Sequence, residues 1–140
     1  MAKIVIDANV IISAAYGGKP LQAVIRAFQE HEVYFSEAII RELKEVIGKL
    51  AKRLSREQVL FIEEKIHQIV SMGKVIDILR RVTISRDAKD DHYLSLCREA
   101  NADFLVTGDK DLLSLSPEQL KKNGIYCSIV NPHSFLERIT

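Results

Sequence analysis

Apolar residues follow two spacings along this chain, and the two alternate from its first residues to its last. Short apolar runs rich in β-branched residues predict buried strands at residues 3–6, 33–35, 103–107 and 126–130. Apolar residues three or four positions apart predict helices at residues 8–16, 21–30, 36–50, 55–70, 90–100 and 132–138. The stretch 75–79 is ambiguous, with a strand as one interpretation. Strands that alternate with helices favour a parallel sheet covered on both faces.

Polar residues and glycines mark where several of these helices begin. Ser36 stands at the N-cap position of the helix that follows the second strand. Ser55 and Gln58 have the spacing of a capping box, which predicts the start of the next helix. Two glycines, a lysine and a proline at residues 17–20 predict a break between the first two helices.

Length and composition indicate one globular domain over residues 1–140. Hydrophobic residues make up 47% of the chain and charged residues 28%, and the net charge of +1 disfavours a strongly basic coat for nucleic acid. No apolar run approaches the roughly 18 residues of a membrane span, and Asp7 interrupts the N-terminal apolar stretch, so we expect a cytoplasmic protein without membrane contact. Cys97 and Cys127 are expected to be buried thiols and not a disulfide.

Four acidic residues carry the candidate chemistry, because each lies where a predicted element begins or ends. They are Asp7, Glu42, Asp90 and Asp109. Asp7 and Asp109 follow predicted strands, and the carboxyl ends of parallel strands line the ligand crevice of an open α/β sheet. Carboxylates gathered there repel one another, so we expect a divalent metal ion and metal-assisted phosphodiester cleavage.

Each of these acids also has an interpretation without catalysis. Asp7 fits the N-cap of the next helix, although Asn9 adds a second oxygen ligand to the same turn. Glu42 lies three residues after Ile39 and four before Val46, at the edge of the apolar stripe of its helix. A glutamate that borders a buried face needs a partner.

The segment around Asp90 holds three acids, and a helix N-terminus favours negative charge without any ligand. Asp87 fits the N-cap of this helix. Asp90 shares a helical face with Leu94, which directs it toward the sheet. Asp91 shares a face with Ser95, which directs it more outward. We therefore expect Asp90 to be the ligand and Asp91 to support it.

Two more acids follow the strand predicted at residues 103–107. Asp109 comes two residues after Thr107, at the end of that strand. We interpret Asp111 as the cap of a short helix at residues 112–115.

Other acidic phosphate chemistries fit less well. A phosphatase of the haloacid dehalogenase type needs a second aspartate at the position of Asn9, and an asparagine cannot transfer that proton. A phosphorelay receiver domain needs a lysine where the last strand runs into Asn131 and Pro132. The chain has no glycine-rich phosphate loop after a strand, and its histidines lack metal-ligand spacing.

In sequence order, four motifs resemble those of the PIN domain, a family of metal-dependent nucleases. They are Ile6-Asp-Ala-Asn-Val10, Ile40-Arg-Glu-Leu43, Asp87-Ala-Lys-Asp-Asp91 and Val106-Thr-Gly-Asp-Lys-Asp-Leu112. The closing segment Ile129-Val-Asn-Pro-His-Ser-Phe-Leu136 resembles the end of a prokaryotic branch classed as toxins of toxin–antitoxin pairs. The resemblance spans residues 3–136. Each motif alone is weak, but four of them in order at these distances are specific.

The resemblance implies a three-layer α/β/α fold with a parallel sheet of about five strands. It also implies a site for Mg²⁺ or Mn²⁺, with the catalytic acids Asp7, Glu42, Asp90 and Asp109. Asp7, Asp90 and Asp109 would bind the metal, and Glu42 would bind it or act as a general base. Asn9, Thr107 and Asp91 would support the site.

The resemblance therefore predicts a ribonuclease that cuts single-stranded RNA internally, with an antitoxin protein as a possible partner. The cations beside the acids are candidate contacts for the RNA backbone, although ordinary solvated charge also explains them; they are Arg41, Arg86, Lys89 and Lys110. Two residues depart from the branch pattern. Ala88 stands where a proline is common, and Gly108 stands where many toxins have an arginine that would contact phosphate.

Two other functions remain open from the sequence, namely a PIN scaffold that binds RNA or protein without cutting and a structure-specific DNA nuclease of the flap type. Retention of all four acids disfavours the first, and 140 residues leave little room for the long insertion of the second. The helices predicted at 36–50 and 55–70 carry more isoleucine and leucine than a small sheet can cover. We therefore expect a homodimer or a tight partner there.

Overall fold

The computed structural model describes residues 1–84 and 90–139. The strands are β1 (Lys3–Ile6), β2 (Glu32–Phe35), β3 (Lys74–Val75), β4 (Phe104–Val106) and β5 (Ser128–Val130). The helices are α1 (Ala8–Ala14), α2 (Gly18–Glu30), α3 (Glu37–Leu50), α4 (Arg56–Ser71), α5 (Asp91–Ala100), α6 (Lys110–Leu113), α7 (Pro117–Lys122) and α8 (Pro132–Ile139). Most of these elements lie where the spacing of apolar residues predicts them.

All strand pairs in the sheet are parallel, in the order β3-β2-β1-β4-β5. The central strand β1 places Ile4 opposite Val33 on one side and Phe104 on the other. The chain builds β2 and β3 on one side of β1 and then crosses to build β4 and β5 on the other. The strand order therefore reverses between β1 and β4, which is where an open α/β sheet forms its ligand crevice.

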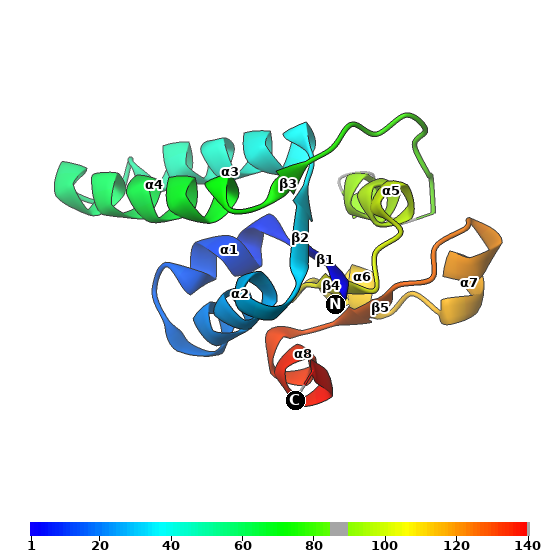
Figure 1. The fold of residues 1–140 in the computed structure, drawn as a ribbon. Coiled ribbons are helices and arrows are strands. Elements are labelled where there is room, and N and C mark those ends of the chain that lie inside the picture. Colours follow the sequence, from blue (N-terminus) through cyan, green and yellow to red (C-terminus); the bar gives the residue numbers. More distant parts are fainter. Residues whose placement is uncertain (85–89, 140) are drawn as a thin grey trace.

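Helices cover both faces of the sheet, as Figure 1 shows. Helix α5 contacts β1, β2 and β4 on one face, while α2 and α8 lie together on the other. Helices α3 and α4 lie side by side and extend away from the sheet, and α1 packs between this pair and α2. The three-layer α/β/α fold with five parallel strands is therefore confirmed.

The core is densest along β1, where Ile4, Val5 and Ile6 are at most 1% exposed. A parallel strand covered on both faces needs such a continuous apolar run. Cys97 and Cys127 are buried free thiols, as expected. Among the residues that the structure describes, no helix has the length and apolar character needed to cross a membrane.

At three places the structure corrects or completes the predicted elements. Helix α2 begins inside the expected break, because Gly17 and Gly18 adopt φ values of 93° and 74° and allow the chain to turn directly into the helix. In the ambiguous stretch 75–79, only Val75 belongs to a strand, which is β3, and residues 76–79 lie outside it. Helix α7 was missed, although Ser116 and Gln119 form a capping box that signals its start.

Candidate functional site

Two strand ends bring Asp7 and Thr107 together at the carboxyl edge of the sheet. The N–H of Asp7 donates to Val106 O at 2.9 Å, so Asp7 continues the ladder between β1 and β4. Thr107 follows β4, and its Oγ1 donates to Asp7 Oδ2 at 2.6 Å. The N–H of Asp109 in turn donates to Thr107 Oγ1 at 3.0 Å. Thr107 therefore links the two acids that follow neighbouring strands.

Asp7 is both a helix cap and a buried acid. Its Oδ1 accepts a hydrogen bond from the Asn9 N–H at 2.9 Å, and the side chain is almost inaccessible. Burial is the main cause that raises the pKa of the Asp7 carboxyl above its usual value, and the negative charge of Glu42 adds to it. The hydrogen bonds from Thr107, Asn9 and Tyr93 lower this pKa without cancelling the rise.

Tyr93 on α5 connects two of the acids and was not singled out from the sequence. Its hydroxyl lies 3.2 Å from Asp7 Oδ1, makes a hydrogen bond with Glu42 Oε2 and accepts one from the Ala8 N–H at 3.0 Å. Burial, and then the negative charge of Asp7, raise the pKa of the Tyr93 hydroxyl. Tyr93 therefore keeps its proton and acts as a donor. A usable signal was its position three residues after Asp90, since residues three apart share a helical face.

Glu42 has the partners that its position beside the apolar stripe of α3 requires. Its Oε2 accepts the hydrogen bond from Tyr93, and its Oε1 lies 3.5 Å from His92 Nε2. The rings of His92 and Tyr93 are in contact, with centroids 4.0 Å apart. Two consecutive residues of α5 therefore hold Glu42 beside Asp7.

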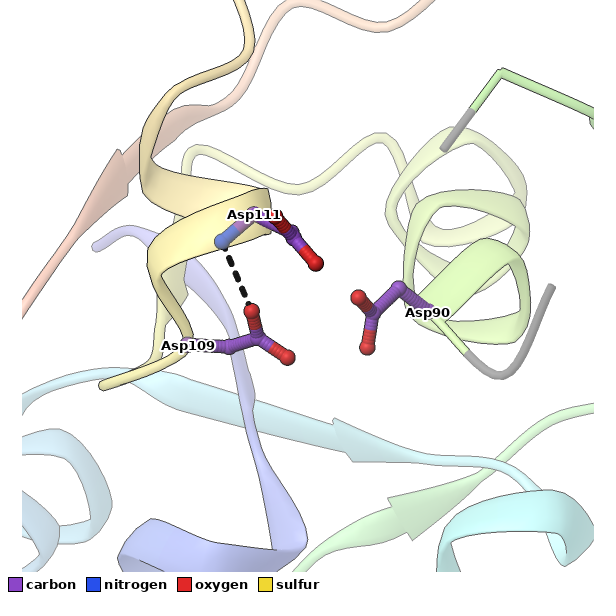
Figure 2. A group of neighbouring side chains, drawn as sticks. All are labelled: Asp90, Asp109 and Asp111. Carbon is purple, nitrogen blue, oxygen red and sulfur yellow. Dashed lines mark hydrogen bonds between the residues drawn. The ribbon is translucent and has the colours of Figure 1, made fainter. Parts of the chain in front are cut away.

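A second group of acids lies beside this pair, and Figure 2 shows its three side chains facing one another. Asp90 precedes α5, Asp109 is the N-cap of α6, and Asp111 lies in the first turn of α6. One carboxylate oxygen from each lies within 4.8 Å of the other two. Asp90 is buried, and the other two are half-buried.

This spacing fits a divalent cation. Mg²⁺ binds oxygen at about 2.0–2.1 Å, so ligands on opposite sides of the ion lie about 4.2 Å apart. Three oxygens within 4.8 Å need only small side-chain movements to share one ion. The same three carboxylates repel one another without a cation.

Two sequence interpretations of this region were wrong. The side chain of Asp109, and not that of Asp111, caps α6, because its Oδ1 accepts the Asp111 N–H at 2.8 Å. The Asp111 side chain instead joins the acidic group. Asp91 does not face outward, because it is 9% exposed and its Oδ1 accepts the Ile84 N–H at 3.1 Å. Asp91 thus ties Ile84 to α5, and Ser95 on the same helix ties Val82, whose N–H donates to Ser95 Oγ at 2.9 Å.

Two surface hollows, each of about 430 Å³, meet at Asn9. The first opens over the acids that follow β1 and β4, and its lining is Asp7, Asn9, Val10, Ser13, Pro20, Gly108, Asp109 and Pro132. The second lies along α3 beside Glu42, and its lining is Asn9, Ala38, Arg41, Glu42, Glu45, Val46, Lys49 and His92.

Two of the four candidate cations belong to the described residues. Arg41 lines the second hollow, and Lys110 is exposed at the start of α6. Arg86 and Lys89 lie outside the described residues, as do Asp87 and Ala88. The structure thus brings Asp7, Glu42, Asp90 and Asp109 to one edge of the sheet and adds Asp111 and Tyr93 to them.

Three solved structures share this fold at low sequence identity. VapBC2 from Rickettsia felis, bound to a DNA fragment from its promoter, matches with a TM-score of 0.61 and 15% identity over 92% of this chain and 98% of that one. PAE2754 from Pyrobaculum aerophilum matches with a TM-score of 0.58 and 17% identity over 99% of this chain and 89% of that one. A domain of a functionally unknown protein from Methanocaldococcus jannaschii DSM 2661 matches with a TM-score of 0.55 and 18% identity over 92% and 91%.

No curated protein matches this chain in sequence. The sequence profile of the PIN domain family, in contrast, matches residues 3–111. This range contains the strands β1 to β4, the first three motifs with most of the fourth, and every acid of the candidate site. The chain therefore belongs to the PIN domain family.

Proposed function

We propose that this protein is a divalent-metal-dependent ribonuclease that cuts single-stranded RNA internally. The observation that carries the proposal is the convergence of Asp90, Asp109 and Asp111 beside Asp7 and Glu42 at the carboxyl edge of the sheet. Membership of a nuclease family supports phosphodiester cleavage. The openness of both hollows to the surface supports a flexible strand as the substrate.

The acids have separate roles in this proposal. Asp90, Asp109 and Asp111 would hold Mg²⁺ or Mn²⁺, and Asp7 would bind the ion directly or through water. When bound, such an ion neutralises charge on the phosphate and makes a water molecule more acidic. Glu42 is the candidate acceptor for the proton of the attacking water, with its Oε2 held by Tyr93 and its Oε1 3.5 Å from His92 Nε2.

Neighbouring residues keep these groups in place. Thr107 donates to Asp7 Oδ2 and thereby leaves Oδ1 to cap α1 and to meet Tyr93. Tyr93 fixes Glu42 relative to Asp7. Asp91 fixes the start of α5, which carries Asp90.

We also propose that the protein acts in the cytoplasm as the toxin of a toxin–antitoxin pair. The Rickettsia felis structure is a VapBC2 assembly on promoter DNA, and we extend a protein partner of that kind to this chain. Co-expression with the product of a neighbouring gene should yield a complex that no longer cuts RNA. An equally active enzyme in that complex would contradict the antitoxin assignment.

We propose further that the protein forms a homodimer through the groove between α3 and α4. This groove has a volume of about 900 Å³, and it is lined by apolar residues together with charges of both signs; the lining includes Ile40, Leu43, Lys44, Ile47, Leu60, Glu63 and Glu64. A surface with both signs of charge suits a two-fold contact of one patch with itself. Light scattering that shows a monomer at high concentration would contradict the homodimer.

One experiment separates the nuclease from its alternatives. The purified protein is incubated with labelled single-stranded RNA, single-stranded DNA and flap DNA, in Mn²⁺ and in EDTA. Cleavage of RNA that requires Mn²⁺ and is lost in Asp109→Asn supports the proposal. Asp77→Asn is the matched control, because Asp77 is exposed and lies outside the acidic group. Binding without cleavage would instead support the scaffold, and preferential cleavage of flaps would support the DNA nuclease.

A further inference from the structure

The hollow along α3 has the chemistry of a subsite for the phosphates of a polynucleotide. Asn9 lines both this hollow and the acidic hollow. A polynucleotide strand that crosses the acids would therefore continue directly into the hollow along α3. Arg41 and Lys49 line this hollow, and both are exposed. Within residues 1–84 and 90–139, the structure shows neither of them in an ion pair. Two cations at the rim of a substrate hollow are thus available to an external anion.

The two cations are separated along the axis of α3, the direction that an RNA strand in this hollow would follow. Arg41 and Lys49 are eight residues apart, which places them near one face of the helix and separates them by about 12 Å at a rise of 1.5 Å per residue. Phosphate contacts from Lys and Arg are the main source of sequence-independent affinity for nucleic acid. Glu45 lies midway between the two cations and lines the same hollow, so it weakens the attraction for an anion.

We propose that Arg41 and Lys49 bind backbone phosphates of single-stranded RNA on one side of the scissile bond, and that Glu45 limits this affinity. The inference rests on the proposed function for the choice of RNA as the ligand. It adds a second subsite, on the far side of Asn9 from Asp109, that holds the strand while the acids act. This subsite recognises the backbone and not the bases.

The test measures binding and requires no cleavage. Fluorescence anisotropy follows a short fluorescein-labelled oligouridylate with the parent protein in EDTA and, separately, in Ca²⁺, over a series of KCl concentrations. Each of Arg41→Gln and Lys49→Gln should weaken binding several-fold. Each should also reduce the slope of log K against log salt by about 0.7, the value for one phosphate contact on a single strand.

Two variants serve as controls. Lys122 is an exposed cation of α7 that lines neither hollow, so Lys122→Gln should leave the affinity and the slope unchanged. Glu45→Gln should tighten binding, a result that loss of folding cannot produce. Equal salt slopes for Lys122→Gln and for the double variant Arg41→Gln/Lys49→Gln would overturn the inference, as would a parent that binds no oligouridylate in either buffer.

The outcomes distinguish this inference from the proposed function. Loss of binding in the Arg41 and Lys49 variants of a protein that never cuts RNA would support the subsite and refute the ribonuclease. If the Arg41 and Lys49 variants bind and cleave RNA as the parent does, the ribonuclease would be supported and the subsite overturned. Preferential binding of an oligothymidylate of equal length would overturn the assignment of the subsite to RNA.

Discussion

The hydroxyl oxygen of Tyr93 lies 3.2 Å from Asp7 Oδ1, and it is the point where α5 meets the carboxyl end of β1. This hydroxyl has one proton for two carboxylates, because it also makes a hydrogen bond with Glu42. Its oxygen accepts the N–H of Ala8 in the first turn of α1. A single buried atom thus sets the relative positions of three elements that carry the site.

Tyr93→Phe should therefore lower both stability and activity. The buried Ala8 N–H would lose its acceptor, which costs about 1–3 kcal/mol in the free energy of unfolding. Glu42 would lose the donor that orients it, so RNA cleavage should slow. Urea denaturation and initial rates measure the two effects. Tyr126→Phe is the control, because Tyr126 is 68% exposed, and equal values for the two variants would refute a structural role for the Tyr93 hydroxyl.

The acids at strand ends were predictable from the sequence because the position of a residue directly after a parallel strand fixes its place in the sheet. Residues that follow parallel strands must lie at one edge of the sheet, so the pattern of apolar runs was enough to assign Asp7 and Asp109 together. Glu42 could be assigned because its place beside an apolar stripe demanded a partner. The identity of that partner could not be deduced, since Tyr93 reaches Glu42 only after α5 has packed across β1.

The errors share a different cause, which is competition among neighbouring polar residues for one role. Asp109 and Asp111 both fit the cap of a short helix, and a shift of one or two residues in its start decides between them. Asp91 was predicted, from helical periodicity alone, to point more outward than Asp90. It is buried, and its Oδ1 accepts a hydrogen bond from the Ile84 N–H.

Asp7→Asn should raise the melting temperature of the metal-free protein at neutral pH. The pKa of Asp7 is raised in the folded state by burial, so ionisation of this group destabilises the fold once pH exceeds its unfolded value near 4. The difference in melting temperature between variant and parent should therefore be small at pH 4 and grow as pH rises toward 7. Calorimetry in EDTA tests this trend, and a difference that does not change with pH would contradict it.

Asp111→Asn should reduce the stabilisation that Mn²⁺ confers. A ligand that binds only the folded state raises stability by mass action, so a weaker site gives a smaller shift in melting temperature. Asp109→Asn should reduce the shift as well while keeping the cap of α6, because asparagine caps a helix about as well as aspartate.

Asp77→Asn should leave the Mn²⁺ shift unchanged and provides the reference for both variants. An Asp111→Asn protein with the full shift would remove Asp111 from the metal site.

Gly108→Arg should strengthen RNA binding. A Cβ at Gly108 would meet no atom within 4 Å, so the backbone has room for a side chain at the edge of the acidic hollow. An arginine there would add a phosphate contact and increase the magnitude of the salt slope by about 0.7. Anisotropy with oligouridylate measures the gain, and Ser71→Arg at the exposed end of α4, outside both hollows, is the control. Equal affinity of the two variants for oligouridylate would show that position 108 does not face the bound RNA.

Gly73→Ala should destabilise the fold. Gly73 lies directly before β3, and a Cβ there would overlap the ring of Phe35 and approach Val33 O to 3.2 Å. The Phe35 ring is fully buried and lies beside that of Phe28, so it cannot move aside freely. Overpacking of this kind costs about 1–3 kcal/mol.

Gly48→Ala makes the same chemical change but is expected to raise the free energy of unfolding. Gly48 lies within α3 and its Cβ would enter open space, so alanine should stabilise the protein by about 0.5–1 kcal/mol through helix propensity. Urea denaturation of both variants gives two shifts of opposite sign. A stabilised Gly73→Ala protein would mean that the Phe35 ring can move away from position 73 without cost, and the overlap between that ring and a Cβ would then not explain the glycine.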